Sequence, residues 1–200
     1  STFRCAEQIR NDVDYHKLNV TIVSVGAGVG YGNLGYSHHS IQDYALMRSF
    51  PNMEIVSPSS NQELINSMQY IIKKAGPKYL RLDKISIDTD LNIKKQSFKP
   101  GKWVLIKKGK LKKTILLTGS CLDKALSLIK QKKYKDYYIY SIPIWSMKCK
   151  NNQSNFLKNF SEILVVENHL EDGGFSSWLK EAKGIGIKIK IRSISLSDKI

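Results

Sequence analysis

The alternation of short apolar runs with amphipathic helical patterns across residues 18–82 limits the fold more than any other feature of the sequence. A β-branched run over 18–25 ends in a glycine-rich loop, and a helical pattern over 41–50 stops at Pro51. A short strand over 53–56, a second helix and a strand over 78–82 follow. This β-α-β-α-β order predicts a mostly parallel α/β layer.

The second of these helices has a clear start and a clear end in the sequence. Ser60 and Glu63 have the spacing of a capping box, in which the hydroxyl and the carboxylate each accept a hydrogen bond from a free backbone N–H. Gly76-Pro77 ends the helical pattern. Between them, one apolar stripe is expected to face the core: Leu64, Ile65, Met68, Ile71 and Ile72.

A second α/β unit is predicted after a polar stretch that ends in Pro100-Gly101. The expected division is a first domain over 1–90, a linker over 91–101 and a second domain over 102–200. Ser120 is predicted to cap a helix carrying Leu122, Leu126 and Ile129, and another helix is expected over 175–182. Strands are expected over 103–106, 114–118, 137–142, 162–166 and 185–191. The predicted class is therefore α/β, with two three-layer units built on mostly parallel sheets, the first of them incomplete.

Charge is distributed unevenly along the 200 residues, which carry a net charge of +15. Residues 1–90 are neutral, so the whole excess lies in residues 91–200. The basic residues are 27 Lys and only five Arg, whereas base readout and phosphate forks favour Arg. We therefore interpret the excess as a solvated lysine surface and expect no nucleic-acid partner, with a polyanion-binding patch as the open alternative.

No apolar run approaches the roughly 20 residues of a membrane span, so no membrane partner is expected. Three cysteines, Cys5, Cys121 and Cys149, are far apart and lack the spacing of a zinc site, and we expect no metal ligands among them. Residues 1–10 carry charges and lack an apolar core of the kind found in secretory signals. These features favour a reduced, cytoplasmic chain.

Two motifs in the loop after the first strand point to chemistry. Gly30, Gly32 and Gly35 fit the G-x-G-x-x-G pattern, but the helix begins too late for a pyrophosphate, so close backbone approach or positive φ is the favoured reason for these glycines. Two adjacent histidines, His38 and His39, stand at the mouth of the following helix and can exchange protons near neutral pH.

Several stretches, in order and in spacing, resemble the transketolase family. In the first half they are 7–12, 35–39, 46–48, 51–53 and 57–59 together with Asp43, which look like the second half of the pyrimidine-binding domain. In the second half, 117–120, 166–169 and 173–175 resemble the family's C-terminal domain. The resemblance implies thiamine diphosphate and Mg²⁺ as cofactors and transfer of a two-carbon ketol unit between sugars, which are expected to be phosphorylated.

The resemblance also implies roles for individual residues. His38 matches the catalytic histidine that lines the substrate channel, and His39 is expected to bind substrate or to fix the loop. Lys84 falls where the family places a residue that binds the substrate phosphate, although that residue is usually Arg. Phe3 and Arg4 match the cofactor-binding aromatic and basic segment. Leu34 and Gly26 depart from the usual acid and histidine, which implies different recognition of the sugar hydroxyls.

Two parts of the family pattern have no match here. They are the Gly-Asp-Gly motif that holds Mg²⁺ and diphosphate, and the glutamate that activates the aminopyrimidine. We therefore expect a partner, an N-terminal transketolase-like subunit, in a homo- or hetero-oligomer, and we expect the chain by itself to be inactive. The alternatives left open are a deoxyxylulose-phosphate-synthase-like enzyme, a 2-oxo-acid dehydrogenase β-type subunit, and a non-catalytic paralogue that binds other proteins or polyanions.

Overall fold

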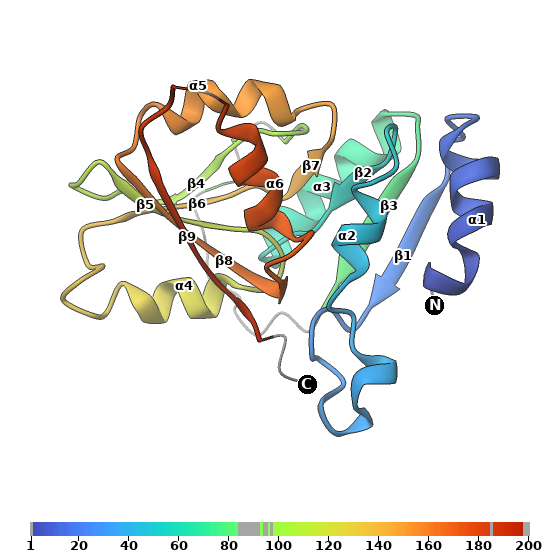
Figure 1. Cartoon of the computed structure of the whole chain (residues 1–200), viewed down its shortest axis with the longest axis horizontal. Helices are drawn as coiled ribbons and strands as arrows, with labels where there is room; N and C mark the ends of the chain where they lie inside the picture. The colour runs from blue at the N-terminus through green and yellow to red at the C-terminus, as the bar shows by residue number, and fades with distance from the viewer. Residues whose placement is uncertain (1, 84–92, 94–95, 97, 185, 198–200) are drawn as a thin grey trace.

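A computed structural model of the chain describes residues 2–83, 93, 96, 98–184 and 186–197. Two β-sheets lie side by side (Figure 1). The loop over residues 26–40, which carries the two adjacent histidines, projects beyond the end of the first strand of the smaller sheet. The chain starts with a continuous helical segment formed by η1 (Thr2–Cys5), α1 (Ala6–Gln8) and η2 (Ile9–Asp14), which lies beside the first strand.

The first sheet has the strand order β1-β3-β2-β7. Strands β1 (Thr21–Val25), β3 (Lys78–Leu82) and β2 (Glu54–Val56) run parallel, as the sequence predicted. The fourth strand, β7 (Ile144–Ser146), is antiparallel to β2 and comes from the second half of the chain. Among the described residues, nothing pairs with the outer edge of β1, where Val23 and Val25 are exposed.

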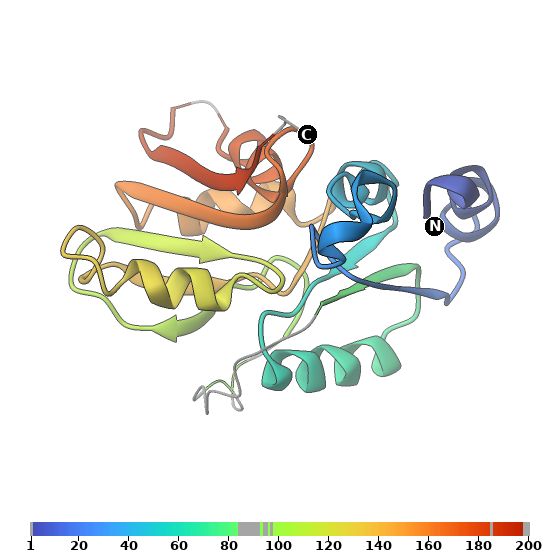
Figure 2. The same cartoon turned by 90° about the horizontal axis from the view of Figure 1, so that it is seen from below.

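Helices α2 (Asp43–Met47) and α3 (Asn61–Lys73) cover opposite faces of this sheet (Figure 2). The predicted capping box is half right. Ser60 Oγ accepts from the N–H of Glu63 at 3.2 Å, but the Glu63 carboxylate accepts from the N–H and hydroxyl of Ser59. Glu63 also bonds Ser141 of the second unit, which explains why its side chain is buried and displaced from the box.

The predicted apolar stripe of α3 is only partly correct. Leu64 and Ile71 pack inward beside Tyr70, against the cluster of Val56, Leu80 and Ile144. The other three members of the stripe are exposed: Ile65, Met68 and Ile72. The predicted stripe is too wide because the narrow four-stranded sheet covers one side of the helix only.

The second sheet has the order β4-β6-β5-β8-β9, with only the β4–β6 pair antiparallel. Its strands are β4 (Val104–Lys107), β6 (Tyr138–Ser141), β5 (Lys113–Leu117), β8 (Glu162–Leu170) and β9 (Lys190–Leu196). Strand β9 lies later than the predicted 185–191. The helices of this unit are α4 (Leu122–Leu128), η5 (Lys150–Gln153) followed by α5 (Ser154–Leu157), and α6 (Phe175–Ala182), which has the predicted bounds.

Alternate residues of β5 and β8 pack on opposite faces of the second sheet. Ile115 and Leu164 face α4, whereas Leu116 and Val165 face α6. The α6 side shares its core with the first unit, because Trp145 and Phe175 lie in the same cluster as Tyr44 of α2. The α/β class with mostly parallel sheets is therefore confirmed, and one hydrophobic core joins the two units. The division of the chain at 91–101 stays a prediction, and residues 91, 92, 94, 95 and 97 of that segment lie outside the described residues.

In the part of the chain that is described, no helix is long and apolar enough to cross a membrane.

Candidate functional site

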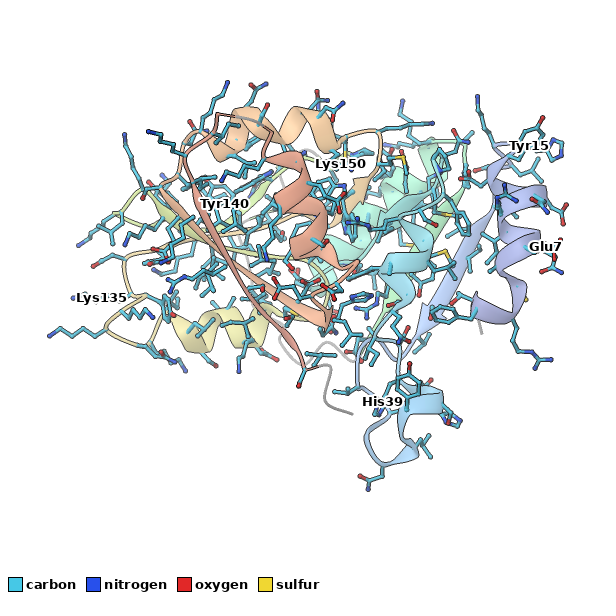
Figure 3. The ribbon with its side chains drawn as sticks, in the orientation of Figure 1. Glu7, Tyr15, His39, Lys135, Tyr140 and Lys150 are labelled. Atoms are coloured by element: carbon cyan, nitrogen blue, oxygen red, sulfur yellow. The ribbon has the colours of Figure 1, made fainter. Side chains whose placement is uncertain are left out.

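The loop that leaves β1 is closed at its base by backbone pairing. Gly28 donates to the carbonyl of Ser40 at 2.9 Å, and Ser40 donates back to the carbonyl of Gly28 at 2.8 Å. Between these two residues the chain forms the 3₁₀ turns η3 (Gly32–Leu34) and η4 (Tyr36–His38). Figure 3 shows His39 in this loop, away from Glu7 of the N-terminal helical segment and from Tyr15, which directly follows that segment.

A cavity of about 590 Å³ lies between this loop, β1 and the start of the N-terminal segment. Phe3, His38 and His39 all line it. The remaining lining residues are Thr2, the stretch 23–26, Tyr36, Ser37, Ser40 and Gln42. The Phe3 side chain is 51% exposed, so much of its ring is available to a ligand.

The two histidines have different hydrogen-bond partners. His38 is exposed, and its Nδ1 lies 3.0 Å from Ser37 Oγ. Since no described residue bonds its Nε2, that nitrogen is the one a ligand can reach. His39 is half-buried, and its Nε2 donates to the carbonyl of Gly32 at 3.0 Å. His38 therefore lines the cavity with a nitrogen that no described residue bonds, while His39 links two parts of the loop through its hydrogen bond to Gly32.

Tyr31 explains the glycine at position 26. A Cβ built on Gly26 would lie 2.1 Å from Tyr31 Cε2, and Gly26 has a φ of +87°. The Tyr31 ring also makes an edge-on contact with His38, with ring centroids 6.4 Å apart. The ring thus occupies the space where the family resemblance would place a histidine.

The glycine motif serves the shape of this loop, as predicted. Gly32 and Gly35 have φ values of +48° and +74°, a region that disfavours other residues. The next α-helix begins only at Asp43, so no helix N-terminus follows the motif closely enough to hold a pyrophosphate.

Two other residues have predicted roles, and neither is seen at this cavity, for a different reason in each case. Arg4 is exposed on η1 and does not line the cavity. Lys84 lies outside the described residues. In the described part of the chain, no group of three or more His, Cys, Asp or Glu residues could hold a metal ion.

A buried polar network beneath the loop was missed at the sequence level. Arg81 of β3 is 2% exposed, and its Nε donates to Asp43 Oδ2 at 2.6 Å. Its other nitrogens donate to Ser40, Tyr44 and Asn168, the last of which belongs to β8 of the second unit. The available signal was an arginine between Leu80 and Leu82 in a short buried strand, because a charge in a buried strand needs a partner.

Charge and burial act against each other in this network. Burial by itself would raise the pKa of Asp43, but the charge and hydrogen bond of Arg81 hold it below its usual value. Burial lowers the pKa of His169 to about 4, although its Nε2 lies 3.8 Å from Asp43 Oδ1. His169 Nδ1 lies 2.7 Å from the Leu170 carbonyl and donates to it. The network therefore holds one buried ion pair and a neutral imidazole beside it.

The two motifs of the second half meet at the same junction. Ser120 does not cap α4, contrary to the prediction. Its hydroxyl instead donates to Asp83 at 2.8 Å and accepts from Asn168 Nδ2 at 2.9 Å. The N–H of Gly119 donates to the Ser57 carbonyl at 2.9 Å. Gly119, Ser120 and Asn168 of these motifs are therefore explained by the hydrogen bonds that they form at the junction with the first unit.

Comparison with known proteins agrees with these observations. A family model described as the pyrimidine-binding domain of transketolase matches residues 1–89. A subunit of apulose-4-phosphate transketolase from Actinobacillus succinogenes is 29% identical over 96% of this chain and 63% of its own length. The 1-deoxy-D-xylulose-5-phosphate synthase of Clostridium perfringens strain 13 is 31% identical over the whole chain, which spans 33% of that enzyme.

A solved structure gives the same answer at the level of the fold. A split-gene transketolase, described as an inactive beta4 tetramer, superposes with a TM-score of 0.80 and 27% identity over 98% of this chain and 63% of that one. The present chain thus spans less than two thirds of these relatives. Its sequence and its fold agree with these relatives, and its residues 1–89 belong to the pyrimidine-binding domain of the transketolase family.

Proposed function

We propose that this chain forms one wall of a thiamine diphosphate site in a transketolase-type enzyme that moves a two-carbon ketol unit between sugars. The observation that supports this most strongly is the convergence of Phe3, His38 and His39 on one cavity, although Phe3 is far from the histidines in sequence. We also propose that the chain needs a partner subunit and is inactive by itself.

The lining of the cavity fits the aminopyrimidine end of the cofactor. The half-exposed ring of Phe3 offers a flat apolar surface on which a second ring can stack. The cavity also has room for such a ring beside His38. When bound, thiamine diphosphate supplies the carbanion that carries the two-carbon unit, and the protein supplies orientation and proton transfer. We place the groups that bind Mg²⁺ and diphosphate on the partner.

Within this proposal the two histidines have separate tasks. The Nε2 of His38, to which no described residue is bonded, can give or take a proton at the reacting carbon or its oxygen, which is the usual role of histidine in proton transfer. His39 keeps the loop in shape through its bond to Gly32, and it also lines the cavity. Ser37 fixes the ring orientation of His38.

The edge of the first sheet supports the need for a partner. Strand β1 is an edge strand in the described structure, and an unpaired edge with exposed valines favours association with another chain. The neighbouring residues Leu18 and Val20 are exposed as well.

The test is turnover after reconstitution with the partner subunit. His38→Ala should lower turnover by roughly 10²–10⁴-fold, the range expected for a proton-transfer group. His39→Ala should cost less, and His16→Ala serves as the control because His16 is exposed and does not line the cavity. Equal losses for His38 and His39 would contradict the assignment.

The choice of donor substrate tests the second candidate. The double histidine favours a deoxyxylulose-phosphate-synthase-like enzyme, and the similarity to the Clostridium perfringens synthase keeps this candidate open. A ketose donor should be consumed in the presence of an aldose acceptor if the chain acts in a ketol transfer. Consumption of pyruvate with an aldehyde phosphate acceptor, and of no ketose, would establish the second candidate instead.

A binding experiment tests the need for a partner. Calorimetric titration of the 200-residue chain with thiamine diphosphate and Mg²⁺ should give no measurable heat of binding, and addition of the partner should restore it. Micromolar binding to the chain without the partner would refute the shared site. No binding with or without the partner would favour a non-catalytic paralogue.

A further inference from the structure

We infer that Asn168, on the second unit, is a positioning residue that fixes the loop of His38 from across the junction between the two units. The inference rests on the proposed function for the role of His38, but the contacts that carry it stand by themselves. Asn168 lies on β8 and is not part of the cavity lining, and its side chain is linked to that lining through Arg81.

Arg81 is the link between Asn168 and the loop. Its Nη2 donates to the carbonyl of Ser40 at 2.6 Å, and Ser40 is the residue that closes the base of the loop against Gly28. The same guanidinium donates to Oδ1 of Asn168 at 2.6 Å and to its backbone carbonyl at 3.2 Å. Hydrogen bonds from a charged donor are stronger than neutral ones, so both contacts hold Arg81 in one orientation.

The end of β8 also touches the loop base directly. The N–H of Leu170 donates to the carbonyl of Ile41 at 3.1 Å. A Cβ added at Gly28 would lie 2.8 Å from the carbonyl oxygen of Asn168, so the two backbones are in close contact. Residues 168–170 therefore contact both ends of the loop, directly at Gly28 and Ile41 and through Arg81 at Ser40.

The amide nitrogen of the Asn168 side chain is also held in place, on the side away from Arg81. Its Nδ2 donates to Ser120 Oγ at 2.9 Å, and the Ser120 hydroxyl donates to Asp83 at 2.8 Å. The amide is therefore oriented with its oxygen toward Arg81, and an alternative flip would place two donors face to face. This orientation is what lets a residue of the second unit set the position of Ser40.

The consequence for His38 follows from its place in the chain. His38 lies two residues before Ser40, so displacement of the Ser40 carbonyl moves the imidazole relative to the cavity. A misplacement of about 1 Å in a catalytic group can cost on the order of 10²-fold in rate. The second unit thus contributes to the site through geometry, without a side chain in the cavity.

Amide hydrogen exchange on the 200-residue chain tests the inference without any need for activity. Asn168→Ala should speed exchange at the Gly28 and Ser40 amides by about tenfold or more, because local opening of the loop base becomes easier, and should leave the amides of β5 unchanged. The control is Ser141→Ala, which also removes a buried bond across the junction, to Glu63, away from the loop. It should leave Gly28 and Ser40 protected.

A second variant covers the case in which Asn168→Ala does not fold. Ser120→Ala removes the partner of Asn168 Nδ2 but keeps the acceptor for Arg81, so an intermediate increase at Gly28 and Ser40 is expected. Unchanged exchange at both amides in the folded variants would overturn the inference. A uniform increase over the whole chain would do the same, since it would mean general destabilisation.

Turnover of the reconstituted complex then separates this inference from the proposed function. Asn168→Ala should lower kcat by about tenfold or more while changing the KM for the sugar by less than about threefold, and Ser141→Ala should not. If the loop amides respond but neither Asn168→Ala nor His38→Ala affects turnover, the role of His38 fails while the positioning contact stands. If His38→Ala lowers turnover and Asn168→Ala changes neither kcat nor exchange, the positioning role is refuted.

Discussion

Replacement of Arg81 by methionine tests whether the buried ion pair holds the junction together. The change removes five hydrogen bonds, to Asp43, Ser40, Tyr44 and two atoms of Asn168, and it leaves the fully buried carboxylate of Asp43 without its counter-charge. Breaking a buried pair in this way costs about 3–5 kcal/mol of unfolding free energy. For a chain of 200 residues this lowers the Tm by about 6–20 °C.

The pH dependence of this loss gives a sharper test, because it has a defined sign. In the wild type the pKa of Asp43 is lowered, so the group contributes stability that is present above pH 3.8 and lost as the pH falls. Without Arg81, burial raises the pKa of Asp43 with no opposing charge. The folded variant then binds one additional proton as the pH falls, shared by the Asp43 carboxylate and the neighbouring His169 imidazole. The deficit of Arg81→Met should therefore shrink from pH 7 toward pH 5, by up to about 1.4 kcal/mol per pH unit.

Urea unfolding followed by circular dichroism at pH 5, 6 and 7 measures both effects. Arg48→Met is the matched control, since Arg48 forms a partly exposed pair with Glu181 and should lose no more than about 1 kcal/mol. The double variant Asp43→Asn/Arg81→Met should recover part of the loss, because it leaves no unpaired charge. A deficit below about 1 kcal/mol for Arg81→Met, or one that widens as the pH falls, would refute the reasoning.

Three shorter predictions concern the site and its supports. Lys84→Ala should raise the KM for a phosphorylated sugar by about ten- to a hundred-fold and leave that for an unphosphorylated ketose nearly unchanged; if both respond alike, Lys84 does not bind phosphate. Gly26→Ala should destabilise the loop, which proteolysis should detect as faster cleavage between residues 26 and 40. Adding Tyr31→Ala to the same chain should relieve the clash between the new Cβ and the Tyr31 ring but not the strain of the positive φ. Burial raises the pKa of Glu167 to about 7 from 4.5, so the unfolding free energy of the wild type should fall by about 3 kcal/mol at most as the pH rises across that range. Urea unfolding of Glu167→Gln should show no such fall.

The elements with strong local signals were predictable from the sequence. Helix α6 has its predicted bounds, and the alternation of apolar runs with helical patterns predicts the parallel arrangement of β1, β3 and β2. The Ser60 hydroxyl caps α3 as expected. Hydrophobic period, glycine-proline stops and N-caps act within a few residues, so they can be read without the tertiary structure.

Only the tertiary structure decided how the two halves join. Strand β7 has three residues and follows Pro143, and nothing local indicates that it completes the sheet of the other unit. Ser120 satisfies a hydrogen bond to Asp83 rather than a helix end, and Arg81 meets Asn168 across 87 positions of sequence. A buried polar residue must form a hydrogen bond with a group that lies next to it in the folded protein. Packing between distant segments decides which group that is, and local sequence patterns carry no information on such packing.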